Sequence, residues 1–522
     1  MKRIESSLQR AFVLSALLAL GLTAWPARAQ GDLTGTSVQI RPTPLSKPQI
    51  LKPASQTPEP NATPPPPAAP RSPQIPSPAE RTLANGLRVI VVERQNMPLV
   101  TASLYVKTGG EADPGELAGL ADMTASLLTK GTDKRSAPEI ADAVEALGGT
   151  LESGAGWDRS TATVNVMSPR FAQALTILAE VVRRPTFKDE EIERLRQQYL
   201  DDLQVALGDP GQLASYAVGR VVFGDAPYGH PLNGTPESIA RIKRADIQGL
   251  HARYYRPDNA ILVIGGDITP ARAFQLAQQN FGDWAKPATP LPAGSQPKTN
   301  ATAAKPRIVV IDKPDAGQAA VYVARQGLKR SDPDYYRGIV ANSVLSGYSG
   351  RLNQEIRIKR GLSYGARSAL EVRREVGPFS ASAQTKNQSG AEVAGLLLGE
   401  LERLAKGDLP DAELTPRKAV LIGNFGRNLE TSTGLVAQVG ALALYGLSLD
   451  EINRYINNVQ AVTAADVQKF AGAHLAAKEA SVVIVGDAKQ FLPELQKQYG
   501  NVEVIPVAEL DLNSAGLRKP KG

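Results

Sequence analysis

The sequence contains no cysteine and very little histidine. Among 522 residues there are 0 Cys and 3 His. Without a thiol the chain can form no disulfide scaffold, no thiolate zinc cluster, no iron–sulfur site and no cysteine nucleophile. The histidines are His230, His251 and His474, and no two of them have the i, i+3 or i, i+4 spacing that places two imidazoles on one helical face. A metal site built on a helix-borne histidine pair is therefore excluded.

Long hydrophobic runs are also scarce. One apolar run, at residues 11–25, follows a basic start and is too short for an ordinary membrane span. The small-x-small pattern at residues 27–29 then predicts a signal peptide at residues 1–29, with an uncleaved anchor as the alternative. We expect an exported, periplasmic chain without an integral membrane span after cleavage. The formal net charge of +7 is a mild excess and indicates no nucleic-acid partner.

A proline-rich stretch follows the leader. Residues 31–78 contain no Phe, Trp or Tyr, and 14 prolines lie between Pro42 and Pro78. Such a composition cannot bury enough apolar surface to offset the entropy lost on ordering. We therefore predict a disordered, extended linker at residues 30–78; the alternative is a ligand for a proline-binding module.

Two strand patterns recur at nearly the same spacing. The apolar run that ends in Gly-Asp at residues 260–267 is repeated at residues 480–487. The strand pattern at residues 103–106, which precedes an Asp-Pro pair, is likewise repeated at residues 320–323. Two independent repeats at one offset indicate a duplicated domain of about 220 residues.

The predicted architecture is α+β. We expect two homologous domains, at residues 79–285 and 306–508, joined by a hinge linker at residues 286–305 and followed by a tail at residues 509–522. Each domain should contain a mainly antiparallel sheet covered by helices, because strand patterns alternate with several long helical patterns. Two like halves joined by a flexible seam predict a clamshell with a cleft between them.

The segment at residues 119–132 predicts a buried helix that ends at Lys130-Gly131-Thr132. This segment resembles the signature helix of the pitrilysin/insulinase-like zinc metallopeptidases, the inverzincins that include processing peptidases and carry an inverted H-x-x-E-H motif. The Tyr-Gly-His-Pro turn at residues 228–231 and the segment at residues 254–259 are also similar to the family. The resemblance spans residues 79–507 and implies the family's two-domain fold.

The metal-binding motif itself is missing. Asp122, Ala125 and Ser126 stand where the family has His, Glu and His, and the third ligand position, a glutamate in the family, matches Asp202, or Asp201 if the register slips by one. A zinc peptidase needs two imidazoles and a proton-accepting carboxylate on this face. We therefore expect no metal and no catalytic residue in this chain, which should be inactive alone.

A hard cation is the alternative occupant of these positions. Asp122 and Asp202 could hold Ca²⁺ or Mg²⁺ through oxygen atoms, although two carboxylates are few ligands for such an ion. We prefer to read them as polar residues that remain on a former active-site face.

The second half retains a different family feature. In two-subunit members of this family, a zinc-free subunit contributes an Arg and a Tyr that orient the substrate. The segment at residues 349–365 is similar to that region, and Arg357 and Tyr364 fall on the two positions. The resemblance thus implies that these two residues bind substrate. Residues 346–350 are a second candidate for substrate contact, but we favour a plain turn there.

The resemblance implies a non-catalytic subunit of an exported, two-subunit, zinc-dependent endopeptidase. Its partner would be a homologous, zinc-bearing subunit in a heterodimer, and the substrate would be a peptide. One alternative is a stand-alone peptide-binding or scaffold protein of the same fold. Another is a peptidase with an unconventional metal site.

Overall fold

The computed structural model describes residues 74–291 and 305–520. The predicted signal peptide at residues 1–29 lies outside these ranges, as do residues 30–73 of the predicted linker and 292–304 of the predicted hinge. Within the two described ranges, no helix is both long enough and apolar enough to cross a membrane.

The first half is built on a six-stranded mixed sheet with the order β1-β2-β6-β3-β5-β4. Only the β2–β6 pair is parallel. The central strand β6 is buried along its whole length, which explains its uninterrupted apolar sequence. The strands are β1 (Ala79–Thr82), β2 (Arg88–Glu93), β3 (Leu99–Val106), β4 (Thr150–Ala155), β5 (Ser160–Met167) and β6 (Ala260–Gly266).

The second half repeats this plan. Its sheet has the order β12-β7-β11-β8-β10-β9, so β7, β11, β8, β10 and β9 take the places of β2, β6, β3, β5 and β4. The β12–β7 and β7–β11 pairs are parallel and the other three pairs are antiparallel. The strands are β7 (Ile308–Asp312), β8 (Ala319–Gln326), β9 (Ala366–Leu370), β10 (Pro378–Thr385), β11 (Ser481–Gly486) and β12 (Glu503–Pro506). The predicted duplication and the mainly antiparallel, α+β architecture are confirmed.

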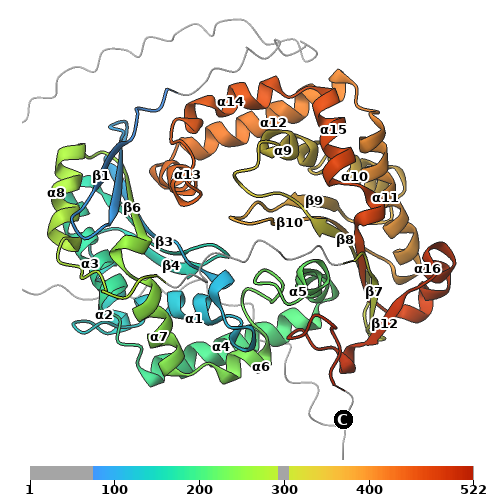
Figure 1. Cartoon of the computed structure of the whole chain (residues 1–522), viewed down its shortest axis with the longest axis horizontal. Helices are drawn as coiled ribbons and strands as arrows, with labels where there is room; N and C mark the ends of the chain where they lie inside the picture. Colours follow the sequence, from blue (N-terminus) through green and yellow to red (C-terminus); the bar gives the residue numbers. More distant parts are fainter. Residues whose placement is uncertain (1–73, 292–304, 521–522) are drawn as a thin grey trace, which may run out of the picture. The chain divides into compact units, whose positions relative to one another are not determined.

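Helices cover the sheets of both halves (Figure 1). Those of the first half are α1 (Leu120–Ser126), α2 (Ala137–Glu145), α3 (Phe171–Arg183), α4 (Asp189–Gly208), α5 (Pro210–Phe223), α6 (Pro236–Arg241), α7 (Arg244–Tyr254) and α8 (Pro270–Phe281). Those of the second half are α9 (Tyr335–Leu345), α10 (Arg351–Asn353), the π-helix η7 (Gln354–Lys359), α11 (Gly390–Lys406), α12 (Asp411–Leu429), α13 (Ser432–Leu444), α14 (Glu451–Ala461), α15 (Ala464–His474) and α16 (Leu492–Tyr499).

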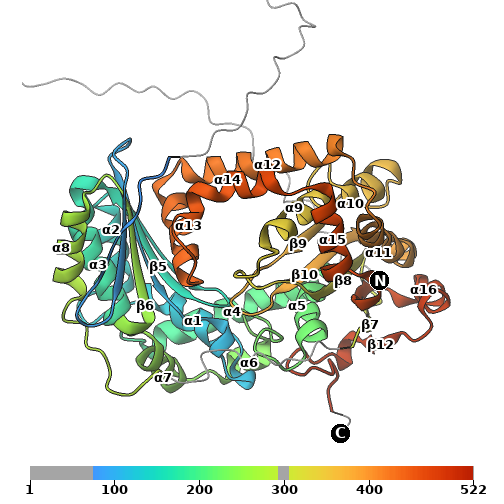
Figure 2. The same cartoon turned by 45° about the horizontal axis from the view of Figure 1, so that its top comes forward.

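One helix of the second half packs on the sheet of the first. Figures 1 and 2 show α13 beside the first sheet, and its residues contact β3 and β6. Alternate residues of β2 divide between two cores: Val89 and Val91 face the first half's own helices, whereas Ile90 and Val92 join the core that contains α13. The approach is close at Gly440, where a Cβ atom would lie 2.3 Å from the ring of Tyr105.

The packing between the halves is reciprocal, because a helix of the first half also packs on the sheet of the second half. Helix α5, from the first half, packs on β8 and β11 of the second sheet. The hydrophobic core between α5 and this sheet includes Val309 and Ile311 of β7. It also includes Leu512 and Leu517 from the predicted C-terminal tail. Arg220 of α5 donates from Nε to the carbonyl oxygen of Leu512 at 2.8 Å. The two halves are therefore joined by buried helices as well as by the chain that connects them.

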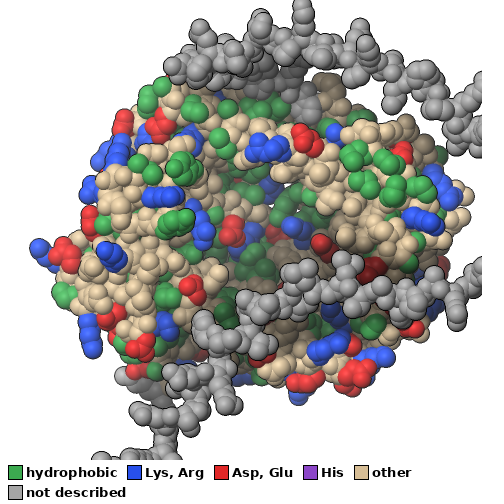
Figure 3. Space-filling model, turned by 180° about the vertical axis from the view of Figure 1, so that it is seen from behind, with side chains coloured by type: hydrophobic (Ala, Val, Ile, Leu, Met, Phe, Trp, Pro, Cys, Tyr) green, Lys and Arg blue, Asp and Glu red, His purple; other side chains and the backbone are tan. Residues whose placement is uncertain are grey.

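Charged side chains are dispersed over the face drawn in Figure 3. Basic and acidic groups alternate there and do not gather by sign. This distribution agrees with the small net charge of the sequence, and the described residues visible on this face form no extended basic surface of the kind that binds nucleic acid.

Candidate functional site

Helix α1 carries the positions at which the family resemblance would place metal ligands. The turn before it requires Gly119, which has a φ of 92° and where a Cβ atom would lie 2.8 Å from Ile239 Cδ1. The carboxylate of Asp113 accepts hydrogen bonds from the backbone N–H groups of Gly119 at 2.9 Å and Ala121 at 2.8 Å. Burial raises the pKa of Asp113 well above its usual value. These contacts fix where the helix begins and which way its side chains point.

Asp122 of α1 is buried and accepts three hydrogen bonds. Its Oδ2 accepts from Asn233 Nδ2 at 2.8 Å and from the Tyr199 hydroxyl at 3.1 Å, and its Oδ1 accepts from the Ala155 backbone N–H at 3.4 Å. The Tyr199 oxygen also lies 2.9 Å from Ser126 Oγ. Since Tyr199 has one proton and gives it to Asp122, Ser126 is the donor in this second contact. The polar groups of the former motif therefore satisfy one another.

This arrangement does not fit a catalytic zinc ion. Ala125 is completely buried and has only a methyl group where a proton acceptor is needed. The carboxylate of Asp122 and the hydroxyl of Ser126 are held by Tyr199 and supply no nitrogen ligand. In the parts of the chain that the structure describes, no group of three or more His, Asp or Glu side chains is placed to hold a metal ion. No chemical step can be derived through zinc on this chain.

The structure distinguishes between the two candidates for the third ligand position. Asp202 lines a cavity of about 640 Å³ together with Asp122, whereas Asp201 does not line it and accepts a hydrogen bond from Gln197 Nε2 at 2.9 Å. Asp202 therefore occupies the position that faces α1. Tyr199, one helical turn before Asp202 on α4, was missed in the sequence, although its i, i+3 spacing from Asp202 places both residues on one face.

Arg357 lies on the π-helical turn η7 in the second half. Short π-helical segments widen a helix and are frequent at functional sites. The Cζ atom of Arg357 lies 4.9 Å from the ring centre of Tyr364 and 5.6 Å from that of Tyr348. These rings are 90% and 74% exposed, respectively. The structure thus brings the two predicted residues, Arg357 and Tyr364, into contact and adds Tyr348 to them.

Tyr348 belongs to the segment at residues 346–350, for which the sequence favoured a plain turn. The segment does form the turn between α9 and α10. The buried amide of Asn353 connects this turn to the chain after Tyr364: its Nδ2 donates to the Tyr348 carbonyl oxygen at 2.6 Å, and its Oδ1 accepts from the Ala366 N–H at 3.4 Å. This shared anchor fixes the backbone of the two segments whose tyrosines contact Arg357, and the sequence carried no signal for it.

Tyr364 opens onto a second cavity, of about 480 Å³. Gln212 and Ser215 of α5, Gln384 of β10 and Arg367 of β9 also line it. Asp209 and Gln212 line both this cavity and the one beside Asp122, so the two cavities adjoin. Asp209 is fixed there because its carboxylate caps α5 by accepting from the Gln212 backbone N–H at 2.8 Å. The two cavities therefore share the start of α5 as a wall, and this pair of cavities is called the cleft below.

The three histidines lie away from this cleft. His230 is buried, with its ring nitrogens 2.9 Å from the Gly110 carbonyl oxygen and 3.0 Å from that of Pro231. His251 Nε2 lies 2.8 Å from the Val182 carbonyl oxygen, and burial lowers the pKa of both His230 and His251. His474 lies 3.4 Å from Asp334 in the second half. None of the three lines either cavity.

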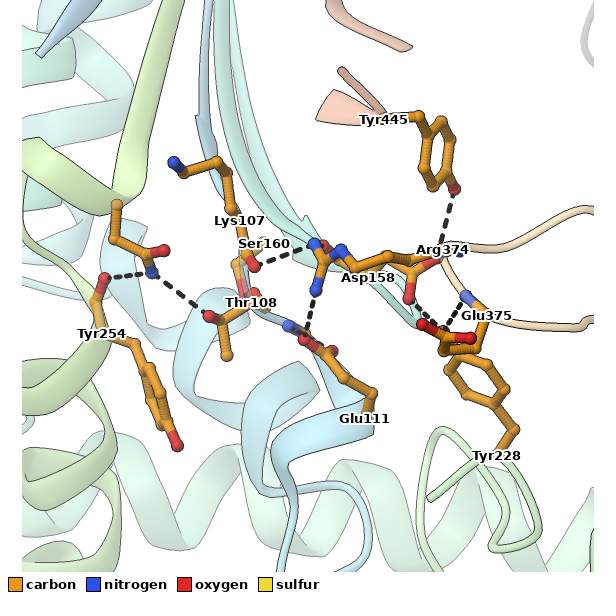
Figure 4. A network of polar contacts seen from close by, with 12 residues as sticks. Lys107, Thr108, Glu111, Asp158, Ser160, Tyr228, Tyr254, Arg374, Glu375 and Tyr445 are labelled. Atoms are coloured by element: carbon orange, nitrogen blue, oxygen red, sulfur yellow. Dashed lines mark hydrogen bonds and ion pairs between the residues drawn. The ribbon is translucent and has the colours of Figure 1, made fainter. Parts of the chain in front are cut away.

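A polar network joins the two halves (Figure 4). The loop between β9 and β10 carries Arg374, whose Nη2 donates to the carbonyl oxygens of Lys107 at 3.0 Å and Asp158 at 2.9 Å. Its Nη1 contacts Glu111 Oε1 at 3.2 Å. Burial raises the pKa of Glu111 to about 8, although the Arg374 guanidinium acts in the opposite direction.

Asp158 is the acceptor at the centre of this network. Its carboxylate accepts from the Arg374 backbone N–H at 2.8 Å, the Tyr228 hydroxyl at 2.5 Å and the Tyr445 hydroxyl at 3.2 Å. The adjacent Arg373 guanidinium is buried against the ring of Trp157, with Cζ 4.3 Å from the ring centre. The β9–β10 loop of the second half is thereby fixed in the first half, and this determines where β9 and its neighbour Tyr364 lie.

Comparisons with known proteins agree with this fold. The family model for insulinase, peptidase family M16, matches residues 88–235, and the model for the peptidase M16 inactive domain matches residues 241–421. A solved structure of a peptidase M16 inactive domain from Pseudomonas fluorescens has a TM-score of 0.73 and 28% identity, covering 78% of this chain and 98% of that one. A Helicobacter pylori protease has the same TM-score at 21% identity, covering 79% of this chain and 100% of that chain.

Sequence relatives extend over most of the chain. A Mycobacterium tuberculosis protein described as an uncharacterized zinc protease is 26% identical over 80% of this chain and 95% of its own length. A probable mitochondrial-processing peptidase subunit beta of Arabidopsis thaliana is 21% identical over 80% of this chain and 79% of its own length. The duplicated fold and these matches define a protein of the peptidase M16 class, and its described residues include no group of three or more His, Asp or Glu side chains placed to hold a metal ion. The chain belongs to the insulinase-like M16 peptidase family.

Proposed function

We propose that this chain is the non-catalytic subunit of an exported, two-subunit, zinc-dependent endopeptidase. It would present Arg357 and Tyr364 to an extended peptide, while a homologous, zinc-bearing partner supplies the metal and the general base. The predicted signal peptide at residues 1–29 supports a periplasmic location.

One observation carries the proposal. The polar groups of Asp122 and Ser126, at two of the family's catalytic positions, are both hydrogen-bonded to Tyr199, whereas Tyr364 lines an open cavity and Arg357 contacts its ring. Arg357 makes no side-chain hydrogen bond or ion pair with any residue of the described ranges. A guanidinium and a phenol are suitable donors for the oxygen atoms of a peptide. This pattern suits a subunit that binds peptide and leaves hydrolysis to another chain.

The proposal is tested by mixing this chain with a relative from the same genome that has an intact H-x-x-E-H motif. Cleavage of a quenched fluorescent peptide is measured for each chain alone and for the mixture. We expect the mixture to cleave the peptide and this chain alone to be inactive. In the mixture, Arg357→Gln should reduce turnover by about tenfold or more, since a charged hydrogen bond to substrate is lost, and Tyr364→Phe should reduce it less.

A matched control separates substrate binding from assembly. Arg360→Gln removes the same charge from the end of η7, where Arg360 pairs with Glu355 at 3.1 Å and Glu392 at 3.5 Å, and it should leave turnover unchanged. All variants should elute with the partner in gel filtration. A complex that forms but cleaves nothing would instead identify a scaffold. Equal turnover in wild type and Arg357→Gln would remove the assignment of the site.

A further inference from the structure

We infer that the surroundings of Tyr364 form a carboxylate-binding subsite of the cleft, in which Tyr348 holds the Arg357 guanidinium in place. This inference rests on the proposed function, because it specifies what part of a peptide the two predicted residues bind. It assigns a role to Tyr348 and to Arg367.

Arg357 keeps an uncompensated charge although acidic side chains lie nearby. Glu355, on the same turn, is already paired with Lys359 at 2.8 Å and Arg360 at 3.1 Å. Glu413, which reaches the preceding helix, is paired with Arg351 at 2.8 Å. The unpaired guanidinium, which contacts the cavity-lining Tyr364, is therefore available to form charge-assisted hydrogen bonds with an external anion.

A second unpaired arginine lines the same cavity as Tyr364, three positions further along the chain. Arg367 is exposed on β9, lines the 480 Å³ cavity with Tyr364, and has no side-chain hydrogen bond or ion pair among the described residues. The acidic residue in the wall of this cavity is Asp209, whose carboxylate already caps α5. The rest of the wall is formed by amides, hydroxyls and small residues. The positive charges of Arg357 and Arg367 and the negative charge of Asp209 leave a formal net charge of +1 around Tyr364.

Tyr348 and Tyr364 restrict the guanidinium without neutralising it. A cation–π contact attracts the guanidinium to the face of the ring and leaves the N–H groups of arginine free. Asn353 bonds to the backbone of both tyrosine-bearing segments and so fixes the two segments relative to each other. The ordered guanidinium then loses less side-chain entropy when an anion binds. Tyr348 is on this account a positioning residue that acts through Arg357.

A carboxylate is the peptide group that best matches two guanidinium groups. It accepts charge-assisted, bidentate hydrogen bonds, whereas a backbone carbonyl offers one neutral oxygen. In a peptide the carboxylate comes either from the C-terminus or from an Asp or Glu side chain. Both sources share this chemistry.

The test measures binding of unlabelled decapeptides to the full chain by isothermal titration calorimetry. All peptides have an Ala-, Gln- and Ser-based sequence. One has a free C-terminus, one is C-terminally amidated, and two further amidated peptides carry a central Asp or a central Asn. We expect the carboxylate-bearing peptides to bind about threefold to tenfold more tightly than their neutral counterparts. For each matched pair of peptides, the affinity of the charged peptide is divided by that of the neutral peptide. The pair with the larger ratio, C-terminal or central, identifies the source of the carboxylate.

Variants show whether Tyr348 acts through its ring. Tyr348→Leu should lower the preference for the carboxylate peptides, whereas Tyr348→Phe should retain this preference. Arg357→Gln should abolish most of the preference. The control Arg360→Gln should leave the preference unchanged. A purely structural role for Tyr348 would weaken all peptides equally and leave the ratio as in wild type.

Equal binding of charged and neutral peptides, or no binding of the carboxylate peptides at millimolar concentration, would overturn the subsite. If Arg357→Gln still impaired cleavage in the mixed enzyme, the proposed function would survive that result, with Arg357 binding a carbonyl instead. If both the preference and the effect on cleavage were absent, both proposals would fail.

Discussion

The face of α1 and the surroundings of Tyr364 belong to the two adjoining cavities of the cleft, and their polar groups are satisfied in opposite ways. At α1, Asp122 accepts hydrogen bonds from Tyr199, Asn233 and the backbone. Around Tyr364, by contrast, Arg357 contacts exposed aromatic rings and makes no ion pair with a described residue. Polar groups that bond to one another stabilise the fold, whereas unpaired groups at a cleft are available to a ligand.

The comparison implies that substitutions in the two regions will have different effects. Changes at α1 should lower the free energy of unfolding without changing the residues that meet peptide. Changes around Tyr364 should alter peptide binding with little effect on stability.

The largest effect on stability is expected for Asp122→Ala. It leaves the Tyr199 hydroxyl and the Asn233 amide without their acceptor, so we expect the free energy of unfolding in urea to fall by about 2–3 kcal/mol. Asp202→Ala is the matched control, because Asp202 is exposed in the same cavity and makes no hydrogen bond with a described residue. It should change stability by less than about 0.5 kcal/mol. Equal effects of the two substitutions would contradict the structural role of Asp122.

A smaller effect is expected from pH. Since burial raises the pKa of Glu111 from 4.5 to about 8, the folded chain holds this proton more tightly than the unfolded chain does. The contribution of Glu111 to stability is therefore present at low pH and decreases as pH rises between these two values. We expect Glu111→Gln to lessen the fall in unfolding free energy between pH 6 and pH 8 by on the order of 1 kcal/mol. If the unfolding free energy of Glu111→Gln changed with pH as steeply as that of the wild type, Glu111 would be ionised in the folded chain throughout this range.

The smallest effect on stability is expected in the surroundings of Tyr364. Arg357→Gln removes two exposed cation–π contacts and no hydrogen bond or ion pair with a described residue. The free energy of unfolding, measured in urea, should therefore fall by less than about 1 kcal/mol. The same variant should lower turnover in the mixed enzyme. A large loss of stability would show that Arg357 is mainly structural and would remove the contrast between the two regions.

The sequence predicted the architecture well because the duplication left local signals. The apolar runs of β6 and β11 are fully buried central strands, and such strands have an uninterrupted apolar sequence that is easily recognised. The exchange of α5 and α13 was not predicted. An amphipathic pattern shows that a helix buries one face but does not show which sheet receives it.

The candidate site was predicted only where neighbouring residues in the sequence carry it. Arg357 and Tyr364 were found because they are close along the chain and match a family pattern. The contacts of Arg374 with Asp158 and Lys107 join residues 216 and 267 positions apart, and no local pattern reports such pairs. Tyr348 and Asn353 were missed for a related reason, since their role depends on how two loops meet.

The most direct test of the account is the zinc content of this chain alone. The full chain is treated with a chelator, incubated with excess zinc, freed of unbound metal and measured by atomic emission, in parallel with Asp122→Asn. The account predicts far less than one zinc per chain, no difference between the two proteins, and no cleavage of a test peptide. One zinc per chain that is lost in Asp122→Asn, together with peptide cleavage by the wild type, would contradict it.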